Sequence, residues 1–252
     1  MTAFFNLNGC HILVTGASSG IGRGTAILLS QLGAKITLVG RNESRLNEVI
    51  TCMAGNGHVA KPFDLCQVDN IPLLLREIAN EHGALDGLFH GAGIDGVIPV
   101  QIMNRVRIDS IFDSSIYAAL MLCRGFLAMR NKTNMSSIVI MSSISAQIGT
   151  KGYSVYSASK AAIDGAIKSL ACEFAPANIR INSIVAGAVK TEMHDRMTQF
   201  LSPEACAEFE RKFLLGFGTV SDISSAAAFL LSPLSKWITG TSMVVDGGFT
   251  CQ

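Results

Sequence analysis

The chain has 252 residues, of which 49% are hydrophobic and 15% are charged, and its formal net charge is +1. A chain of this length and apolar content can bury a large core, so we expect a single domain over residues 1–252. Because basic and acidic residues are balanced and spread along the chain, we expect neither a nucleic-acid groove nor a polybasic membrane patch, and the partner is a small molecule.

The chain has seven cysteines, an odd number. The sequence contains no Cys-x-x-Cys pair, and no histidines are grouped near the cysteines. They indicate reduced thiols rather than disulfides or a zinc site, so no metal is expected. Neither residues 1–9 nor the apolar stretch 118–129, which Arg124 interrupts, has the pattern of a signal peptide or a membrane span. We therefore expect a cytoplasmic protein outside the membrane.

The first predicted element is a buried strand over residues 10–15, which runs into the glycine-rich sequence of residues 15–22. Apolar residues then recur at helical spacing, so the order strand, glycine turn, helix is expected. Glycines let backbone N–H groups approach a pyrophosphate, and the positive end of the helix faces the same anion. The turn predicts a dinucleotide site that includes Gly16, Ser18, Ser19, Gly20, Ile21 and Gly22.

The second predicted strand, residues 35–39, is followed by Gly40 and Arg41. NAD-binding chains usually place an acidic residue here, about 20 residues after the glycines, for the ribose hydroxyls. Arg41 can instead form a two-pronged contact with a 2′-phosphate, which favours NADP over NAD. The alternative is a solvated arginine that opens the helix expected over residues 42–53.

A third strand is predicted over residues 58–63, and a helix over residues 65–81 follows it, with Pro72 tolerated in the first turn. Asp64 stands at the carboxyl end of the strand, where it can meet the adenine of a cofactor. Helix capping or solvation of the carboxylate is the alternative.

The fourth strand, residues 85–89, ends in His90-Gly91-Ala92-Gly93. Two glycines at a strand end indicate a backbone that passes close to a ligand, here the cofactor. Residues 104–129 are expected to be mostly helical.

The fifth strand, residues 138–141, leads to Ser143, and a long helix is expected over residues 154–174. Parallel sheets bind ligands beyond the carboxyl ends of their strands, which places Ser143 on the chemical side. Tyr156 and Lys160 are four residues apart and so share one face of the helix. A positive neighbour favours the phenolate, which makes tyrosine a usable acid or base near neutrality, and Ser143 can hold the substrate oxygen.

The remaining chain is predicted to contain strands over residues 179–185 and 243–245, a helix over residues 221–231, and a helical excursion over residues 192–215. Strands that alternate with helices and are apolar throughout predict an α/β, Rossmann-type, doubly wound parallel sheet of about seven strands with helices on both faces. The substrate region, at about residues 191–217, has apolar side chains that suit an apolar ligand, although core or subunit contact is the alternative. These side chains are Met193, Met197, Phe200, Phe209, Phe213 and Phe217.

Along essentially its whole length the chain resembles the short-chain dehydrogenase/reductase family, and it is most similar to the 3-oxoacyl-(acyl carrier protein) reductase-like branch. The matching residues are Thr15-Gly-x-x-x-Gly-x-Gly22, Asp64, Ala92-Gly93, Ser143, Tyr156-x-x-x-Lys160, Gly187 with Thr191, and the ending Thr239-Gly240 to Asp246-Gly247-Gly248. The resemblance implies that Tyr156 is the proton donor or acceptor, that Lys160 lowers its pKa and binds the nicotinamide ribose, and that Ser143 orients the carbonyl.

The resemblance also implies further cofactor contacts, with residues 187–191 against the nicotinamide. These contacts are Leu65, Gly91, Ala92, Gly93, Gly187, Val189 and Thr191.

Several positions depart from the family pattern. At residues 90–93 the family usually has Asn-Asn-Ala-Gly, whereas this chain has His90 and Gly91 in place of the asparagines. At residues 186–187 the family usually has Pro-Gly, whereas this chain has Ala186 in place of the proline. Ser115 stands where an asparagine completes the catalytic tetrad, and that asparagine, in a distorted helix, helps keep a water linking Lys160 to solvent. We expect Ser115 to be a weaker member of this relay whose hydroxyl bonds back to a carbonyl one turn earlier.

Two classes of function stay open. The first is an NADP-dependent oxidoreductase that transfers hydride between nicotinamide and a carbonyl or secondary alcohol, with a 3-oxoacyl thioester as one candidate substrate. The second is a low-turnover NADP-binding regulatory or partner protein on the same fold. Retention of Ser143, Tyr156 and Lys160 together favours the enzyme.

The resemblance implies a symmetric homo-oligomer, which we expect to be a tetramer, with a dimer as the alternative. The long helices from Asn104 and Ser154 are expected to pair across one two-fold axis, and the last strand with its helix across another. Apolar outer positions of the second helix suit close helix contact; these are Ala161, Ala162, Ala166 and Leu170.

Overall fold

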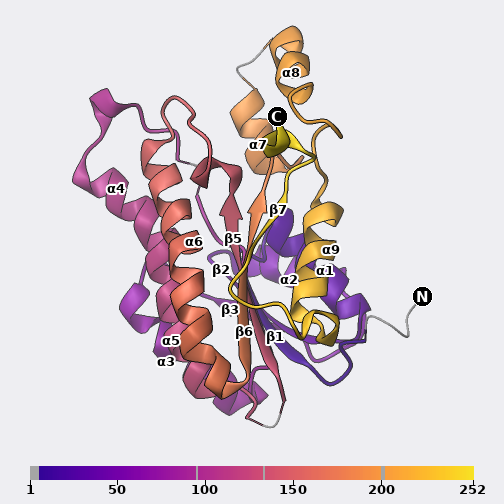
Figure 1. Cartoon of the computed structure of the whole chain (residues 1–252). Coiled ribbons are helices and arrows are strands. Elements are labelled where there is room, and N and C mark those ends of the chain that lie inside the picture. Colours follow the sequence, from indigo (N-terminus) through magenta and orange to yellow (C-terminus); the bar gives the residue numbers. More distant parts are fainter. Residues whose placement is uncertain (1–5, 95, 133, 200–201) are drawn as a thin grey trace.

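The computed structural model describes residues 6–94, 96–132, 134–199 and 202–252. Within these residues the chain forms one sheet of seven parallel strands in the order β3-β2-β1-β4-β5-β6-β7 (Figure 1). The strands are β1 His11–Thr15, β2 Lys35–Gly40, β3 Val59–Pro62, β4 Gly87–His90, β5 Ser136–Ser143, β6 Ile179–Ala186 and β7 Ser242–Val245. The order reverses beside β1, because the chain first builds outward to β3 and then crosses over to β4. The predicted doubly wound parallel sheet is confirmed.

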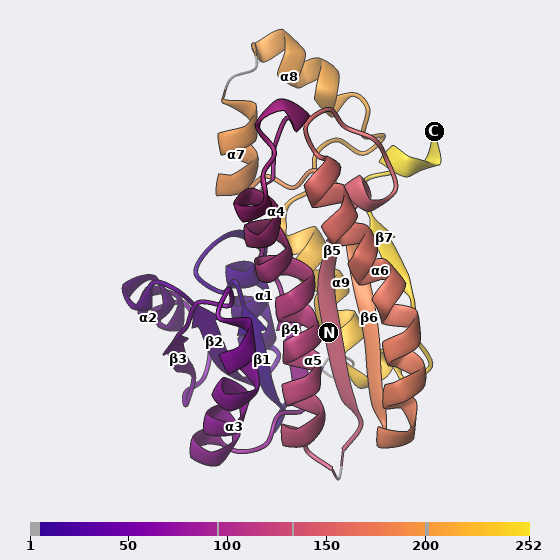
Figure 2. The same cartoon turned by 90° about the vertical axis from the view of Figure 1, so that its left-hand side faces the viewer.

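Helices cover both faces of the sheet (Figures 1 and 2). One face carries α1 Gly20–Gln31, α2 Glu43–Thr51 and α9 Val220–Leu231. The other face carries α3 Ile71–His82, α5 Ala118–Met129 and α6 Ser154–Phe174, with α4 Arg105–Phe112 packed beside α6. The shorter helices α7 Glu192–Thr198 and α8 Pro203–Glu210 lie beyond the carboxyl ends of the strands.

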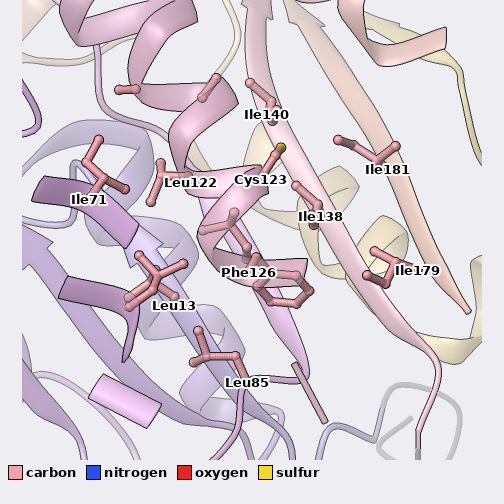
Figure 3. Close-up of a cluster of buried hydrophobic side chains, with 14 of the residues drawn as sticks. Leu13, Ile71, Leu85, Leu122, Cys123, Phe126, Ile138, Ile140, Ile179 and Ile181 are labelled. Carbon is pink, nitrogen blue, oxygen red and sulfur yellow. The ribbon is translucent and has the colours of Figure 1, made fainter. Parts of the chain in front are cut away.

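Alternate strand residues supply two separate hydrophobic cores. In β1, Leu13 faces the core under α5 and α6, whereas Val14 faces the core under α1 and α9. In β5, Ile138 and Val139 divide in the same way. Figure 3 shows the first of these cores, in which the ring of Phe126 from α5 lies over the central strands. Burial on both faces explains why most residues of the central strands are apolar.

The helical run Arg105–Met129 joins α4 and α5 through a π turn, Asp113–Tyr117. Among the described residues it is the one helical run long and apolar enough to span a membrane by length and composition. However, 56% of its most apolar window is buried inside the protein, which is the position of a core helix. The predicted helix over residues 104–129 is thus confirmed, with a local distortion.

The aromatic residues of the excursion pack on one another. The ring centroids of Phe209, Phe213 and Phe217 lie 5.3 to 5.5 Å apart, and Phe213 and Phe217 are almost fully buried. These phenylalanines therefore form a core contact, which was the alternative to a ligand surface. Met197 is 40% exposed and accepts a hydrogen bond from the Tyr153 hydroxyl, whereas Phe200 lies outside the described residues.

The four positions proposed for the outer face of α6 do not all face outward. Ala161 is exposed, but Ala162, Ala166 and Leu170 are partly buried and pack against the core. These three residues are thus shared between the core and the surface, and the helix contact expected on this face stays a prediction.

Candidate active site

The predicted site residues gather at one edge of the sheet. The carboxyl ends of the strands lie at the end of the molecule that carries α7 and α8 (Figure 1). Parallel α/β sheets bind their ligands in the crevice outside this edge, where the strand order reverses. Here the reversal lies between β1 and β4, so the glycine turns after these two strands flank it.

The first glycine turn requires glycine for both conformation and space. Gly16 and Gly20 have positive φ angles of +65° and +50°. A Cβ atom on Gly16 would lie 2.7 Å from the backbone nitrogen of Ala92, and one on Gly22 would lie 2.2 Å from the Gly16 carbonyl oxygen. The turn therefore packs directly against the second glycine turn.

The amino end of α1 fits an anionic group. Its N-cap, Ser19, forms no side-chain cap bond within the described residues, and the first turn carries no acidic side chain. The first N–H groups of a helix have no intrahelical partners and carry a partial positive charge. The residues of this turn thus fit the pyrophosphate of a dinucleotide.

Arg41 follows β2 directly, and its side chain is exposed at the carboxyl edge. Ser18 lies next to the end of the same strand, with its Oγ 3.6 Å from where a Cβ on Gly40 would be. Asp64 follows β3, and its Oδ1 accepts a hydrogen bond of 3.0 Å from the Cys66 backbone. Burial and Asp64 raise the pKa of the Cys66 thiol while Arg41 opposes the shift, so Arg41 and Asp64 act on one thiol.

Leu65 and the glycines of the second turn were also predicted as cofactor contacts. The Leu65 side chain is buried in the core. The Gly91 N–H donates to the Thr15 carbonyl at 3.2 Å. A Cβ on Gly93 would lie 3.7 Å from the Lys160 ammonium nitrogen. The second turn thus runs from the first glycine turn to the lysine.

Tyr156 and Lys160 lie together beside the end of β5. The Lys160 ammonium lies 5.6 Å from the centroid of the Tyr156 ring and donates a 3.0 Å hydrogen bond to the Met141 carbonyl. Lys160 is only 4% exposed, and this burial lowers its pKa to about 8, against the opposing effect of Asp164. The Lys160 ammonium is therefore a buried cation that is hydrogen-bonded to β5 and lies beside the Tyr156 ring.

Ser143 is the last residue of β5 and caps the short helical turn that follows. Its Oγ accepts a hydrogen bond of 3.2 Å from the Ser145 backbone N–H. Because that bond uses a lone pair, the hydroxyl hydrogen remains available to donate to a substrate oxygen.

Ser115 lies in the π turn and is 2% exposed. Its hydroxyl finds no hydrogen-bond partner within the described part of the chain, so the expected bond to a carbonyl one turn earlier is wrong. The neighbouring Ser114 makes that bond instead, to the Ser110 carbonyl at 3.0 Å. The two serines therefore differ, although both lie in the π turn.

The loop after β6 returns to the first glycine turn. A Cβ on Gly187 would lie 2.8 Å from the Cα of Asp246, so this loop is packed against the residues after β7. The Val189 side chain is buried. Thr191 caps α7, and its methyl group would lie 3.5 Å from a Cβ on Gly20.

Sequence reasoning missed two groups at this edge. Thr15 and His90 are buried and hydrogen-bonded to each other at 2.8 Å, although they are 75 residues apart. Only the presence of histidine in place of the usual family asparagine signalled that position 90 is unusual.

Comparisons with known proteins agree with this geometry. A family model described as enoyl-(acyl carrier protein) reductase matches residues 16–250. The chain is 32% identical over 247 residues to a 3-oxoacyl-[acyl-carrier-protein] reductase of Chlamydia pneumoniae, covering 97% of this chain and 98% of the relative. It is 30% identical over 250 residues to a glucose 1-dehydrogenase of Gluconobacter oxydans, with 96% and 92% covered.

Solved structures show the same relationship. A short-chain type dehydrogenase/reductase from Mycobacterium marinum matches with a TM-score of 0.90 and 30% identity, covering 98% of both chains. A dehydrogenase/reductase from Sinorhizobium meliloti matches with the same TM-score and identity, covering 99% of this chain and 98% of the other. The chain therefore belongs to the short-chain dehydrogenase/reductase family of oxidoreductases, which use a nicotinamide dinucleotide and act on alcohols and carbonyl groups.

Proposed function

We propose that this protein is an NADP-dependent reductase of a ketone, acting reversibly on the corresponding secondary alcohol, with a 3-oxoacyl thioester as the first candidate substrate. The observation that carries the proposal is the buried Lys160 ammonium beside Tyr156, at the strand end that Ser143 completes. Burying a cation is costly, and buried ionisable groups with shifted pKa values cluster at functional sites.

In this proposal two side chains act on the substrate oxygen, and the third acts on the tyrosine. Ser143 donates a hydrogen bond to the substrate carbonyl oxygen, and Tyr156 delivers a proton to the same oxygen. Lys160 stabilises the phenolate that remains, because its charge is poorly screened in the buried site. A bound nicotinamide dinucleotide supplies the hydride for reduction or takes it up in oxidation.

The cofactor would lie along the carboxyl edge. The residues of the first glycine turn, Gly16 to Gly22, would hold the pyrophosphate, and Asp64 and Leu65 would line the adenine side. The nicotinamide half would meet the second glycine turn, residues 91–93, and the loop that carries Gly187, Val189 and Thr191. Ser115 would assist the proton path to Lys160, and the protein would work in the cytoplasm.

A 3-oxoacyl thioester is preferred because relatives named for that substrate recur among the similar proteins, at 30 to 32% identity. We expect a panel of ketones, sugars and acyl thioesters, followed by absorbance of the reduced nicotinamide, to contain at least one substrate. Tight binding of NADPH without turnover on any compound would favour the low-turnover binding protein instead.

We expect Arg41→Ala to weaken NADPH binding by about 10- to 100-fold, because a charge-assisted contact contributes about 1.5–3 kcal/mol. NADH affinity should change little. Both dissociation constants can be measured by fluorescence titration. Arg45→Ala is a matched control, since Arg45 is an exposed arginine four residues further along that pairs with Glu192 at 3.9 Å. Equal affinities of the wild type for NADPH and NADH would contradict the assignment.

We propose a homotetramer as the working assembly. Apolar side chains remain exposed on α5 and near the edge strand β7, including Leu120, Leu127 and Trp237, the last of them 96% exposed. Exposed apolar groups of this size commonly mark subunit contacts. Light scattering at micromolar concentration should give four times the chain mass of 26.7 kDa. A monomeric mass would refute the proposal.

A further inference from the structure

His90 occupies a central position between the glycine turns and the π turn. It is the last residue of β4, it is 1% exposed, and it lies directly opposite Thr15 in the register with β1. Its Nδ1 lies 2.8 Å from the Thr15 Oγ1, and its Nε2 lies 3.4 Å from the Ser115 carbonyl oxygen. The imidazole therefore joins two neighbouring strands to the helix on the other side of the site.

The chemistry of the partners fixes the direction of these hydrogen bonds. The Ser115 carbonyl can only accept, so Nε2 carries the proton and Nδ1 of a neutral ring accepts from the Thr15 hydroxyl. Thr15 Oγ1 in turn accepts from the Ala92 N–H at 3.4 Å. One series of donors thus runs from the second glycine turn through Thr15 and His90 to the π turn.

Only the neutral ring satisfies all of these partners. A charged imidazole would present a second N–H to Thr15 and would leave the threonine hydrogen without this acceptor in a buried site. Burial, followed by the charge of Lys160, lowers the pKa of His90 to about 3, in agreement with the neutral form. Lys160 of α6 is the charged group that acts on this imidazole, whereas its hydrogen-bond partners, the Thr15 hydroxyl of β1 and the Ser115 carbonyl of the π turn, are uncharged.

The three segments that His90 joins all border the lysine. The second glycine turn passes beside the lysine, since a Cβ atom built on Gly93 would lie 3.7 Å from the Lys160 ammonium nitrogen. The π turn packs against α6, with Ile116 and the α6 residue Ile163 in the same core. Lys160 itself is fixed to β5 through the Met141 carbonyl. Movement of the π turn or of the glycine turn would therefore move the surroundings of the catalytic cation.

We propose that His90 is a positioning residue for the proposed reductase activity, on which this inference rests: its neutral imidazole holds the Ser115 carbonyl and, through Thr15, the second glycine turn in place around Lys160. In this role His90 acts through the two turns and not on the substrate oxygen or the phenol itself. It acts by keeping the two turns at the spacing that the tyrosine and lysine require.

The test compares two substitutions at position 90. Leucine fills much of the same space but removes both hydrogen bonds, whereas asparagine keeps one donor and one acceptor. We expect His90→Leu to lower kcat by at least about ten-fold, since small displacements in an active site have effects of this size. KM and the dissociation constant of NADPH should change by less than about three-fold, and His90→Asn should recover most of kcat.

A second buried histidine provides a matched control. His11 is the first residue of the central strand β1, at the end away from Thr15 and the candidate site. Its ring nitrogens lie 2.8 Å from the Thr37 hydroxyl and 3.1 Å from the Gly83 carbonyl. His11→Leu should lower Tm about as much as His90→Leu and leave kcat unchanged. If both variants lose kcat in proportion to Tm, His90 is only structural and the proposal is wrong.

Nitrogen-15 NMR of the imidazole provides a readout without turnover. The His90 resonance, identified by its loss in His90→Asn, should show the neutral Nε2–H tautomer from about pH 8 to pH 5, below the ordinary histidine range. A charged ring or an Nδ1–H tautomer at neutral pH would overturn the proposal. A wild type without turnover contradicts the proposed function and the catalytic role of His90 with it, whereas an active wild type with a fully active His90→Leu variant contradicts only the role of His90.

Discussion

Tyr156→Phe is expected to lower kcat at least ~10²-fold while NADPH binding persists, because the substitution removes only the hydroxyl that exchanges the proton. The ring of Tyr156 packs edge-on against Tyr153 at 5.9 Å between centroids, and phenylalanine can keep that contact. The fold should therefore remain intact. The measurement is kcat on a substrate from the panel, together with a separate titration of NADPH.

Ser115 provides the comparison within the same site. Because its hydroxyl has no partner among the described residues, Ser115→Ala removes no hydrogen bond that the structure contains. We expect a much smaller loss for Ser115→Ala than for Tyr156→Phe, and a rate equal to or above the wild type for Ser115→Asn. Wild-type turnover by Tyr156→Phe would show that the proposed mechanism is wrong. A loss in Ser115→Ala equal to that in Tyr156→Phe would make Ser115 a principal catalytic group.

Lys160→Met is expected to reduce kcat by at least ~10²-fold, since methionine matches the lysine in length but cannot stabilise a phenolate. Stability at pH 7 should change far less. The buried charge lowers the pKa of Lys160 to about 8 from an unfolded value of about 10.4, which corresponds to roughly 3 kcal/mol of unfavourable burial. Lys160→Met removes this unfavourable burial of charge. The Met141 carbonyl loses its hydrogen-bond donor at the same time, which costs about 1–3 kcal/mol and offsets much of the gain.

The burial of the Lys160 charge also predicts how the stability of the folded protein changes with pH. Between about pH 8 and pH 10.4 the unfolded chain binds more protons at Lys160 than the folded protein does. The wild type should therefore gain stability relative to Lys160→Met as the pH rises through this window, and below about pH 8 the full penalty of the buried charge remains. Denaturant titrations of both proteins at pH 7 and pH 10 measure the difference. A stability difference that does not change with pH would contradict the burial argument.

The fold could be predicted from local signals. Predominantly apolar runs identified the strands. The glycines at residues 16, 20 and 22 identified the turn, because backbone sterics allow little else there. The long helix begins and ends at the predicted residues, Ser154 and Phe174. The four-residue spacing placed Tyr156 and Lys160 on one face of it.

What the sequence could not supply depends on contacts between distant segments. His90 and Ser115 are 25 residues apart, and neither residue type indicates that the imidazole donates to a backbone carbonyl. Ser114 bonds back to a carbonyl whereas Ser115 does not, and no periodicity of the sequence tells these neighbours apart. The phenylalanines of the excursion have helical spacing, but spacing does not say whether their rings face a ligand or one another.

The central place of β1 has a consequence for how the chain is made. This first strand pairs with β2 on one side, but its other edge waits for β4, whose residues begin at Gly87. At synthesis rates of about 5–20 residues per second, the roughly 50 residues between β2 and β4 take several seconds to follow. During that interval an apolar strand edge is open to other chains. Production of the protein should therefore depend strongly on the elongation rate and on chaperones that bind this nascent edge.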